Sequence, residues 1–142
     1  MRRADILAYM RASKFAVVGT IGPNGPQGAL VGVAVTDDFE IIFDTVRDSR
    51  KHRNLEINSR ASVTFSGPDE QTLQFEGIAH AVSLDDPTDA RWRETYYAAW
   101  PDGIARRNWP KISYWRIMPH WLRYSDFARG PLVEEIDFEK ER

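Results

Sequence analysis

The chain of 142 residues contains no cysteine and only three histidines. The absence of cysteine excludes disulfide bonds, thiol catalysis and cysteine-ligated zinc or iron–sulfur centres. Among the histidines, His80 and His120 have no neighbouring carboxylate in the sequence that would make either one a general base. We therefore expect no metal site, and the sequence identifies no catalytic side chain.

Long apolar runs and an excess of positive charge are also missing. No stretch approaches the roughly 18 apolar residues that a membrane-spanning helix needs, and charged Asp5 and Arg11 interrupt the N-terminal segment where a secretory signal would be apolar. The formal net charge of -2 is not that of a general nucleic-acid binder. We expect a cytoplasmic protein that binds neither membranes nor nucleic acid.

The length and composition favour one hydrophobic core. A chain of 142 residues lies within the usual size of one domain, roughly 100 to 200 residues. Hydrophobic residues make up 42% of it, which is enough to exclude global disorder. No repeat or linker divides the chain, so we expect a single domain over residues 1–142.

Most of the chain shows the two-residue alternation of β-strands. Asn24-Gly25 is a hairpin signal between the first two strands. The expected strands are residues 14–21, 28–36, 39–45, 61–66 and 72–84, and then a hairpin of 112–118 with 121–127 across Pro119, followed by a trailing acidic tail. Helices are expected over residues 4–13, 47–58 (capped by Asp48 or Ser49) and 85–100. The fold class is therefore mainly β, a six- to seven-stranded antiparallel barrel with peripheral helices.

A local basic cluster lies where the third strand gives way to a helix. Residues 47–53 hold four arginines or lysines against one aspartate. Backbone N–H groups and the helix dipole at such a corner favour a phosphate. The planar guanidinium of Arg50 would bind two phosphate oxygens, and the ammonium of Lys51 would attract the phosphate as a point charge. A solvated basic helix face would have the same composition, and spacing alone does not separate the two.

The segment FDTVRDSRKHRNL at Phe43–Leu55, followed by RASVTF and LQFEGIAHAV, resembles the central motif of the pyridoxamine 5'-phosphate oxidase-like, FMN-binding split-barrel proteins. The resemblance implies an FMN-binding split barrel that forms a homodimer with sites at the interface. It also implies that the strand at Gly28–Val33 runs along the flavin ring and that a glutamine, Gln74 or Gln71, lies near it. Gly28 and Gly32 would allow the close approach of a flat ligand, although glycine in a strand also marks a bulge or a bend. The cofactor-binding residues that it implies are Thr45, Ser49, Arg50, Lys51, Asp44, Val31, Gly32 and Gln74.

The C-terminal part departs from the best-known enzyme of that family. The oxidase carries an Arg-x-His arrangement and a flavin-stacking tryptophan there, whereas here Ser125 stands near the tryptophan position and no histidine follows His120. The resemblance therefore implies an FMN-dependent oxidoreductase that acts on another small organic substrate. Trp121, Arg123 and Tyr124 are expected on the substrate side, although Arg123 could equally pair with a neighbouring carboxylate.

Two alternatives keep the barrel and change its use. Some members of the family prefer a deazaflavin to FMN, and the sequence does not separate these cofactors. A flavin- or haem-binding protein without turnover would also suit the loss of the oxidase's substrate residues. A third reading, single-stranded nucleic acid bound at the basic corner, conflicts with the net negative charge.

Overall fold

A computed structural model describes residues 2–142 and contains one antiparallel sheet of eight strands. Seven strands run in the order β2-β1-β5-β6-β7-β4-β3, and β8 pairs with β7 beside this path. The strands are β1 (Phe15–Gly22), β2 (Gly25–Gly32), β3 (Ala34–Val35), β4 (Ile41–Val46), β5 (Arg60–Ser66), β6 (Gln71–Val82), β7 (Ile112–Asp126) and β8 (Leu132–Asp137). The expected mainly β, antiparallel split-barrel class is confirmed. The strand expected over residues 28–36 is divided into β2, which pairs with β1, and β3, which pairs with β4.

The predicted hairpin across Pro119 is wrong, because residues 112–126 form the single long strand β7. Pro119 pairs with Gly77 where the register between β6 and β7 shifts. A proline is tolerated at such an irregularity, since no regular ladder hydrogen bond is required of its missing N–H. A Cβ at position 77 would lie only 2.1 Å from the carbonyl oxygen of Met118, so the bare glycine lets the two strands approach here.

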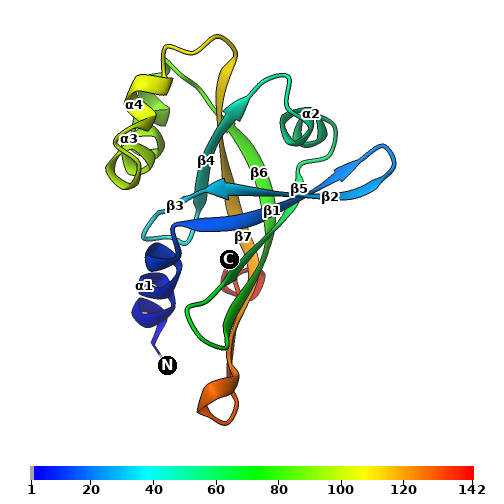
Figure 1. Ribbon diagram of the computed structural model, residues 1–142, viewed down its shortest axis with the longest axis vertical. Coiled ribbons are helices and arrows are strands. Elements are labelled where there is room, and N and C mark those ends of the chain that lie inside the picture. The colour runs from blue at the N-terminus through cyan, green and yellow to red at the C-terminus, as the bar shows by residue number, and fades with distance from the viewer. Residues whose placement is uncertain (1) are drawn as a thin grey trace.

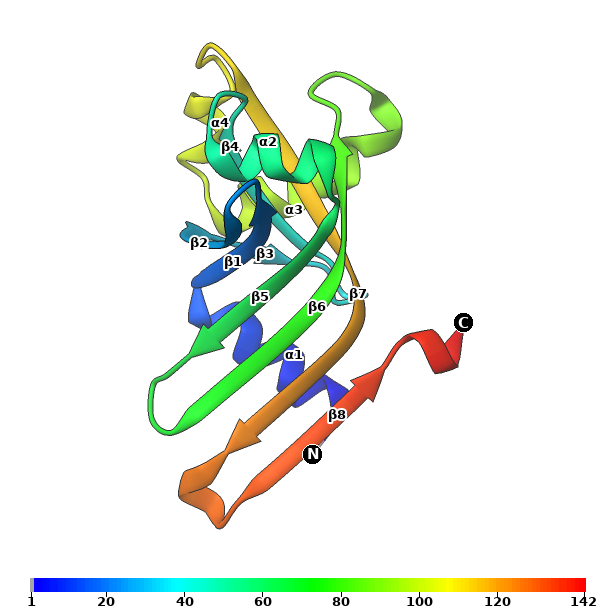
Figure 2. The same ribbon diagram turned by 90° about the vertical axis from the view of Figure 1, so that its right-hand side faces the viewer.

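The great length of β7 splits the barrel. Its first half pairs with β4 and its second half with β8, and the two partners diverge, as Figure 2 shows. The segment after Gly130 was expected to trail off, but it forms β8, whose Ile136 is buried in the core. The acidic residues of this strand therefore lie on an edge of the sheet rather than in a free tail.

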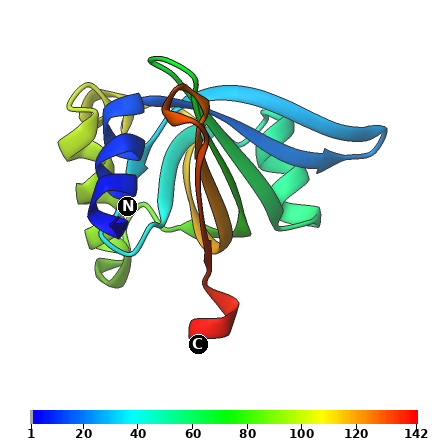
Figure 3. The ribbon, with the colours of Figure 1, turned by 90° about the horizontal axis from the view of Figure 1, so that it is seen from below.

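Helices cover the open sides of the sheet. They are α1 (Arg3–Ser13), α2 (Arg50–Ile57), α3 (Ala90–Ala99) and α4 (Gly103–Arg106), with short 3-10 turns at Pro87–Asp89, Phe127–Arg129 and Glu139–Glu141. Figures 1 and 3 place α1, α3 and α4 on one side of the molecule and α2 on the other, beside the β1–β2 hairpin. The first three helices lie close to the predicted positions, and α4 has no counterpart in the prediction.

Two hydrophobic clusters hold these layers together. The larger one fills the barrel with the inward residues of most strands, and α1 adds Ile6 and Met10 to it. The smaller one packs Trp92 and Tyr96 of α3 against Ile42 and Tyr114 on the other face of β4 and β7. The strand β4 is thus covered on both faces, and the corner at its end is held in a fixed place.

Candidate functional site

The corner between β4 and α2 is organised by two hydroxyl groups. Thr45 Oγ1 donates to Ser49 Oγ over 2.9 Å, and the backbone N–H of His52 donates to the same Ser49 oxygen over 3.2 Å. Ser49 is therefore the N-cap of α2, one of the two residues predicted for this role. Since its oxygen accepts both bonds, its own O–H remains available to donate to an anion.

Two cations follow the cap without a protein partner. Among residues 2–142, neither Arg50 nor Lys51 forms a salt bridge or a side-chain hydrogen bond, in contrast to Arg106 and Arg116, which are both paired. Burial lowers the pKa of the half-buried Lys51 ammonium, and the nearby Asp44 carboxylate partly opposes that shift. A desolvated, unpaired ammonium gains from an anionic ligand, which would restore the interactions lost to burial.

Both cations face a strand from the opposite end of the sheet. Arg50 and Lys51 line a hollow of about 270 Å³ together with Gln27, Gly28 and Ala29 of β2. Thr20 of β1 completes the lining. The basic corner predicted from local sequence is thus joined to the glycine-bearing strand that the resemblance placed beside the flavin.

The strand β2 is the end strand of the sheet, and part of its backbone faces no further strand. The Val33 N–H donates to the Lys14 carbonyl, which continues the β1–β2 ladder. This bond shows which residues of β2 form hydrogen bonds with β1 and which do not. Because antiparallel pairs alternate, the backbone groups of Gly28 and Leu30 then point to the open edge. A flat ligand with hydrogen-bonding edges could bind there through backbone groups alone.

A second hollow adjoins the first through Gln27 and Arg50. It measures about 650 Å³ and lies between α2 and the β1–β2 turn. Arg53 adds a further cation, and Ile21 and Ile57 make part of its wall apolar. Its shape and charge suit a partly apolar group that also carries negative charge.

Asp44 belongs to a network that the sequence did not reveal. Arg106 of α4 donates from Nε to Asp44 Oδ2 over 2.9 Å, from Nη1 to Asp102 and from Nη2 to the Tyr96 hydroxyl. Burial and the Asp44 carboxylate raise the pKa of Tyr96, so this phenol stays protonated. The carboxylate next to Lys51 is thereby already engaged by a guanidinium.

The predicted close approach at Gly32 is made by a side chain of the protein itself. A Cβ at this position would lie 2.7 Å from Cζ2 of Trp100, whose indole N–H donates to the Val33 carbonyl. Val31, the neighbouring predicted site residue, is buried with its side chain on the opposite face. The Trp100 ring therefore covers β2 at Gly32 on the face opposite Val31.

The remaining predicted residues lie elsewhere on the sheet. Gln74 is exposed and lies opposite Arg123, which pairs with Glu135 and places its guanidinium 5.4 Å from the Trp121 ring. Tyr124 points to the other face, where it is buried and accepts a hydrogen bond from Gln71. The structure thus gathers Thr45, Ser49, Arg50, Lys51 and Asp44 in one corner and does not bring Gln74, Trp121, Arg123 or Tyr124 to it.

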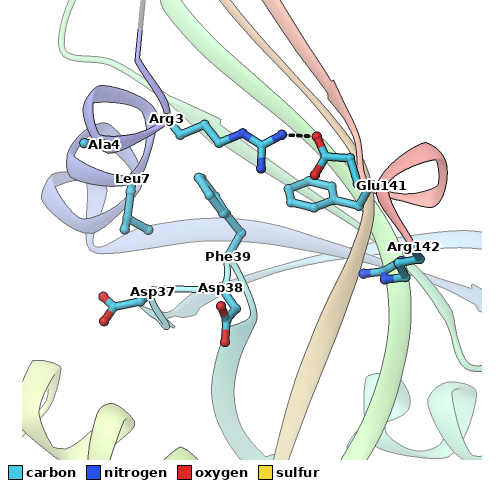
Figure 4. Close-up of a pocket in the computed structure, with 9 residues that line it drawn as sticks. Arg3, Ala4, Leu7, Asp37, Asp38, Phe39, Glu141 and Arg142 are labelled. Atoms are coloured by element: carbon cyan, nitrogen blue, oxygen red, sulfur yellow. Dashed lines mark hydrogen bonds and ion pairs between the residues drawn. The ribbon is translucent and has the colours of Figure 1, made fainter.

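Another hollow, of about 460 Å³, lies between α1, the β3–β4 turn and the C-terminal 3-10 turn. Figure 4 shows Phe39 and Leu7 in it, and the ion pair of Arg3 with Glu141 across it. None of the predicted site residues lines this hollow. Its charges are mutually paired or exposed, and it has no donor set comparable to that of the corner.

Within residues 2–142, no cluster of three or more His, Cys, Asp or Glu side chains could hold a metal ion. In the same described part of the chain, none of the helices has the length and hydropathy required to span a bilayer.

A sequence model described as Pyridoxamine 5'-phosphate oxidase matches residues 3–126. The chain belongs to this family. No match is found among curated proteins. The family assignment therefore rests on a match that covers both the basic corner and the open strand.

Solved structures with the same fold are described as binding different ligands. A heme binding protein from Mycobacterium smegmatis has a TM-score of 0.79 and 16% identity, and the match covers 98% of this chain but 60% of that protein, so our chain is shorter than this relative. The heme storage protein HutZ from Vibrio cholerae has a TM-score of 0.71 and 17% identity, and the match covers 84% of this chain and 91% of that protein. A pyridoxamine 5'-phosphate oxidase-related, FMN binding protein from Nostoc punctiforme has a TM-score of 0.67 and 15% identity, and the match covers 95% of each chain. At these identities the comparisons show a shared fold only.

Sequence reasoning missed the residues that reach the corner from distant elements. Arg106 lies in a helix of four residues, too short for a periodic pattern. Gln27 and Asn54 are joined by a 2.6 Å hydrogen bond that fixes α2 on the β1–β2 hairpin, and neither stood out as a polar residue in the sequence. Only the glycines of β2 gave a signal, since glycine within a strand often marks a close approach.

Proposed function

We propose that this protein is an FMN-binding flavoprotein that transfers electrons to or from a small organic molecule. The observation that carries the proposal is the pair of unpartnered cations, Arg50 and Lys51, facing the open backbone edge of β2 across a hollow of about 270 Å³. The family assignment and the FMN-binding relative of the same fold support it.

The donors at the corner fit a phosphate ester. Ser49 offers an O–H, Arg50 a planar fork and Lys51 a desolvated ammonium, which together match the several oxygens of a phosphate dianion. The N-terminus of α2 adds its dipole. Bound flavin supplies the redox chemistry, while these residues hold its phosphate and the edge of β2 aligns its ring.

Haem suits the corner less well. None of the residues that line the two adjoining hollows in the described chain is a histidine, cysteine, methionine or tyrosine, the usual axial ligands of haem iron. His52, the nearest histidine in sequence, is buried and accepts a hydrogen bond from Trp115. The donor set therefore favours a phosphate-bearing cofactor over haem.

A deazaflavin is the second candidate, and the larger hollow favours it. A deazaflavin cofactor continues beyond its phosphate into an acidic tail, and the hollow lined by Arg53 and Ile57 begins at the phosphate-facing Arg50. The variant Arg53→Ala tests which of the two cofactors the protein binds. We expect it to weaken a tailed deazaflavin about tenfold, the effect of losing about 1.4 kcal/mol of charge-assisted bonding, and to leave FMN nearly unchanged.

The outward face of β1 and β2 supports a homodimer. Leu30 is 69% exposed and Phe15 52%, and Val17 and Ile21 are exposed beside them. An apolar surface of this kind is typical of the core of a protein interface. We expect Leu30→Glu to yield a monomer in sedimentation experiments, whereas a wild-type chain that sediments as a monomer would contradict the dimer.

The same face relates the distant predicted residues to the site. The strand registers place Leu30 opposite Val17, Val17 opposite Thr64, Thr64 opposite Gln74, and Gln74 opposite Arg123, in one row across the sheet. In a dimer that buries this face, Gln74, Trp121 and Arg123 of one protomer can approach the flavin edge of the other. This arrangement is part of the proposal.

The test begins with the visible absorbance spectrum of the protein after it is mixed with excess FMN and passed through gel filtration. We expect about one flavin per chain to be retained. Reduction by a nicotinamide donor followed by reoxidation with product formation distinguishes an enzyme from a carrier. A protein that retains no flavin under these conditions contradicts the proposal.

A further inference from the structure

The imidazole of His52 is buried between α2 and β7. Trp115 Nε1 donates to His52 Nδ1 over 3.0 Å, and Ser113 Oγ lies 2.9 Å from the same nitrogen. An indole N–H can only donate, so Nδ1 must accept and the ring proton lies on Nε2. That nitrogen lies 3.5 Å from Oε1 of the exposed Glu56.

The same residue is connected to the phosphate corner through its backbone. The His52 N–H donates to Ser49 Oγ, the oxygen that also accepts from Thr45. Lys51 directly precedes it in the first turn of α2, and Ser113, which touches the ring, lies opposite Thr45 in the β4–β7 register. The imidazole therefore joins the first turn of α2 to the strand next to β4.

We propose that His52 is a positioning residue, whose neutral ring, anchored by Trp115 and Ser113, orients Ser49, Arg50 and Lys51 toward the phosphate. This inference rests on the proposed function, since it concerns how the same site is held in its binding geometry. His52 itself does not line the hollow.

The surroundings of the ring favour its neutral form. The charged groups near it are Glu56 on its own helix and Arg47 in the loop before α2, while β7 presents only the neutral Ser113 and Trp115. Burial lowers the pKa of His52, Glu56 opposes this, and Arg47 adds to it.

Protonation would disturb the anchor. A proton on Nδ1 would face the Trp115 N–H, and this buried donor would lose its acceptor. The ring would have to move, and the first turn of α2 with it. Acid should therefore weaken phosphate binding through His52, in addition to the effect of titrating the phosphate itself.

The experiment compares the Kd of FMN at pH 7.5 and pH 5.5 for the wild type and for His52→Gln. A glutamine carbonyl can accept from Trp115 and does not titrate. We expect the wild type to lose several-fold more affinity on acidification than His52→Gln, because about one unit of difference in the His52 pKa between the free and the FMN-bound protein has a limiting effect of about tenfold, reached only below both pKa values. His80→Gln is the matched control, because His80 also has a pKa lowered by burial but lies on β6, and it should keep the wild-type pH dependence.

Equal losses of affinity in the wild type and in His52→Gln would overturn the inference and leave the proposed function intact. Nitrogen NMR of the wild-type imidazole gives a second test that needs neither FMN nor a variant. We expect an unprotonated Nδ1 at pH 7.5, and backbone amide signals of residues 49–51 that shift with the His52 titration. A proton on Nδ1 at that pH, or amides that do not respond, would overturn the role of His52, whereas a wild type that binds no FMN contradicts the proposed function instead.

Discussion

The double variant Arg50→Ala/Lys51→Ala removes both unpartnered cations from the corner and should nearly abolish FMN binding. A hydrogen bond to a charged group contributes about 1.5 to 3 kcal/mol. Arg50 is exposed and screened by solvent, so it belongs at the lower end, and half-buried Lys51 belongs nearer the upper end. Because both cations grip one phosphate, their losses are not fully additive, and we expect about 3 to 4.5 kcal/mol, or a Kd raised about 10²- to 10³-fold.

The assay is a fluorescence titration of FMN at low and at moderate ionic strength. Arg129→Ala/Lys140→Ala is the matched control, since it makes the same change in net charge with two exposed cations near the C-terminus. The control should bind like the wild type, and salt should weaken the wild type more than the double variant. Thermal unfolding checks that both variants remain folded. A folded Arg50→Ala/Lys51→Ala protein that binds FMN within a few-fold of the wild type refutes the assignment of the phosphate site.

Two further predictions concern stability. Gly32→Ala should destabilise the fold by about 1 to 3 kcal/mol in urea unfolding, because the new Cβ would lie 2.7 Å from the Trp100 ring, which its hydrogen bond to Val33 keeps in place; an unchanged midpoint would show that the indole can move aside. Burial lowers the pKa of both His52 and His80, so the folded state binds fewer protons than the unfolded chain, and the free energy of unfolding should fall as the pH drops below about 6.5. Urea midpoints that are equal at pH 7.5 and pH 5.5 would contradict this sign.

The parts of the fold that depend on neighbouring residues could be predicted from sequence. Alternation located β4, β5 and β6, a run of β-branched and aromatic residues located β1, and the Asn24-Gly25 signal located the hairpin between β1 and β2. That residues 112–126 form one continuous strand could not be predicted, because Pro119 predicts the end of a strand unless the register shift opposite Gly77 is known. The strand β8 has alternating buried and exposed residues, but its acidic composition resembles a tail until β7 provides a partner.

The residues of the candidate site could likewise be predicted only where they are close together in sequence. Thr45, Ser49, Arg50 and Lys51 lie within seven residues, so one local motif was enough to predict them; the structure places them together where β4 meets α2, and their role in binding phosphate is proposed. The residues of β2 that face Arg50 and Lys51, and Arg106 of α4 that binds Asp44, are distant in sequence, and only the tertiary fold brings them to this corner. Gln74 was placed through the resemblance, and its exposed position on the outward face leaves its role dependent on a second protomer.

The state of Asp44 explains why Lys51 remains free. An aspartate beside a half-buried lysine would normally form an ion pair with it and consume its charge. Here Arg106 reaches Asp44 from α4, with Asp102 holding the other side of the guanidinium, so the carboxylate already has a cationic partner. The short helix after Trp100, which the sequence did not predict, thus leaves the ammonium available to an anion from solution. A distant arginine neutralises the competing carboxylate while Arg50 and Lys51 stay without partners, and this arrangement supports the proposal that the corner binds an anion.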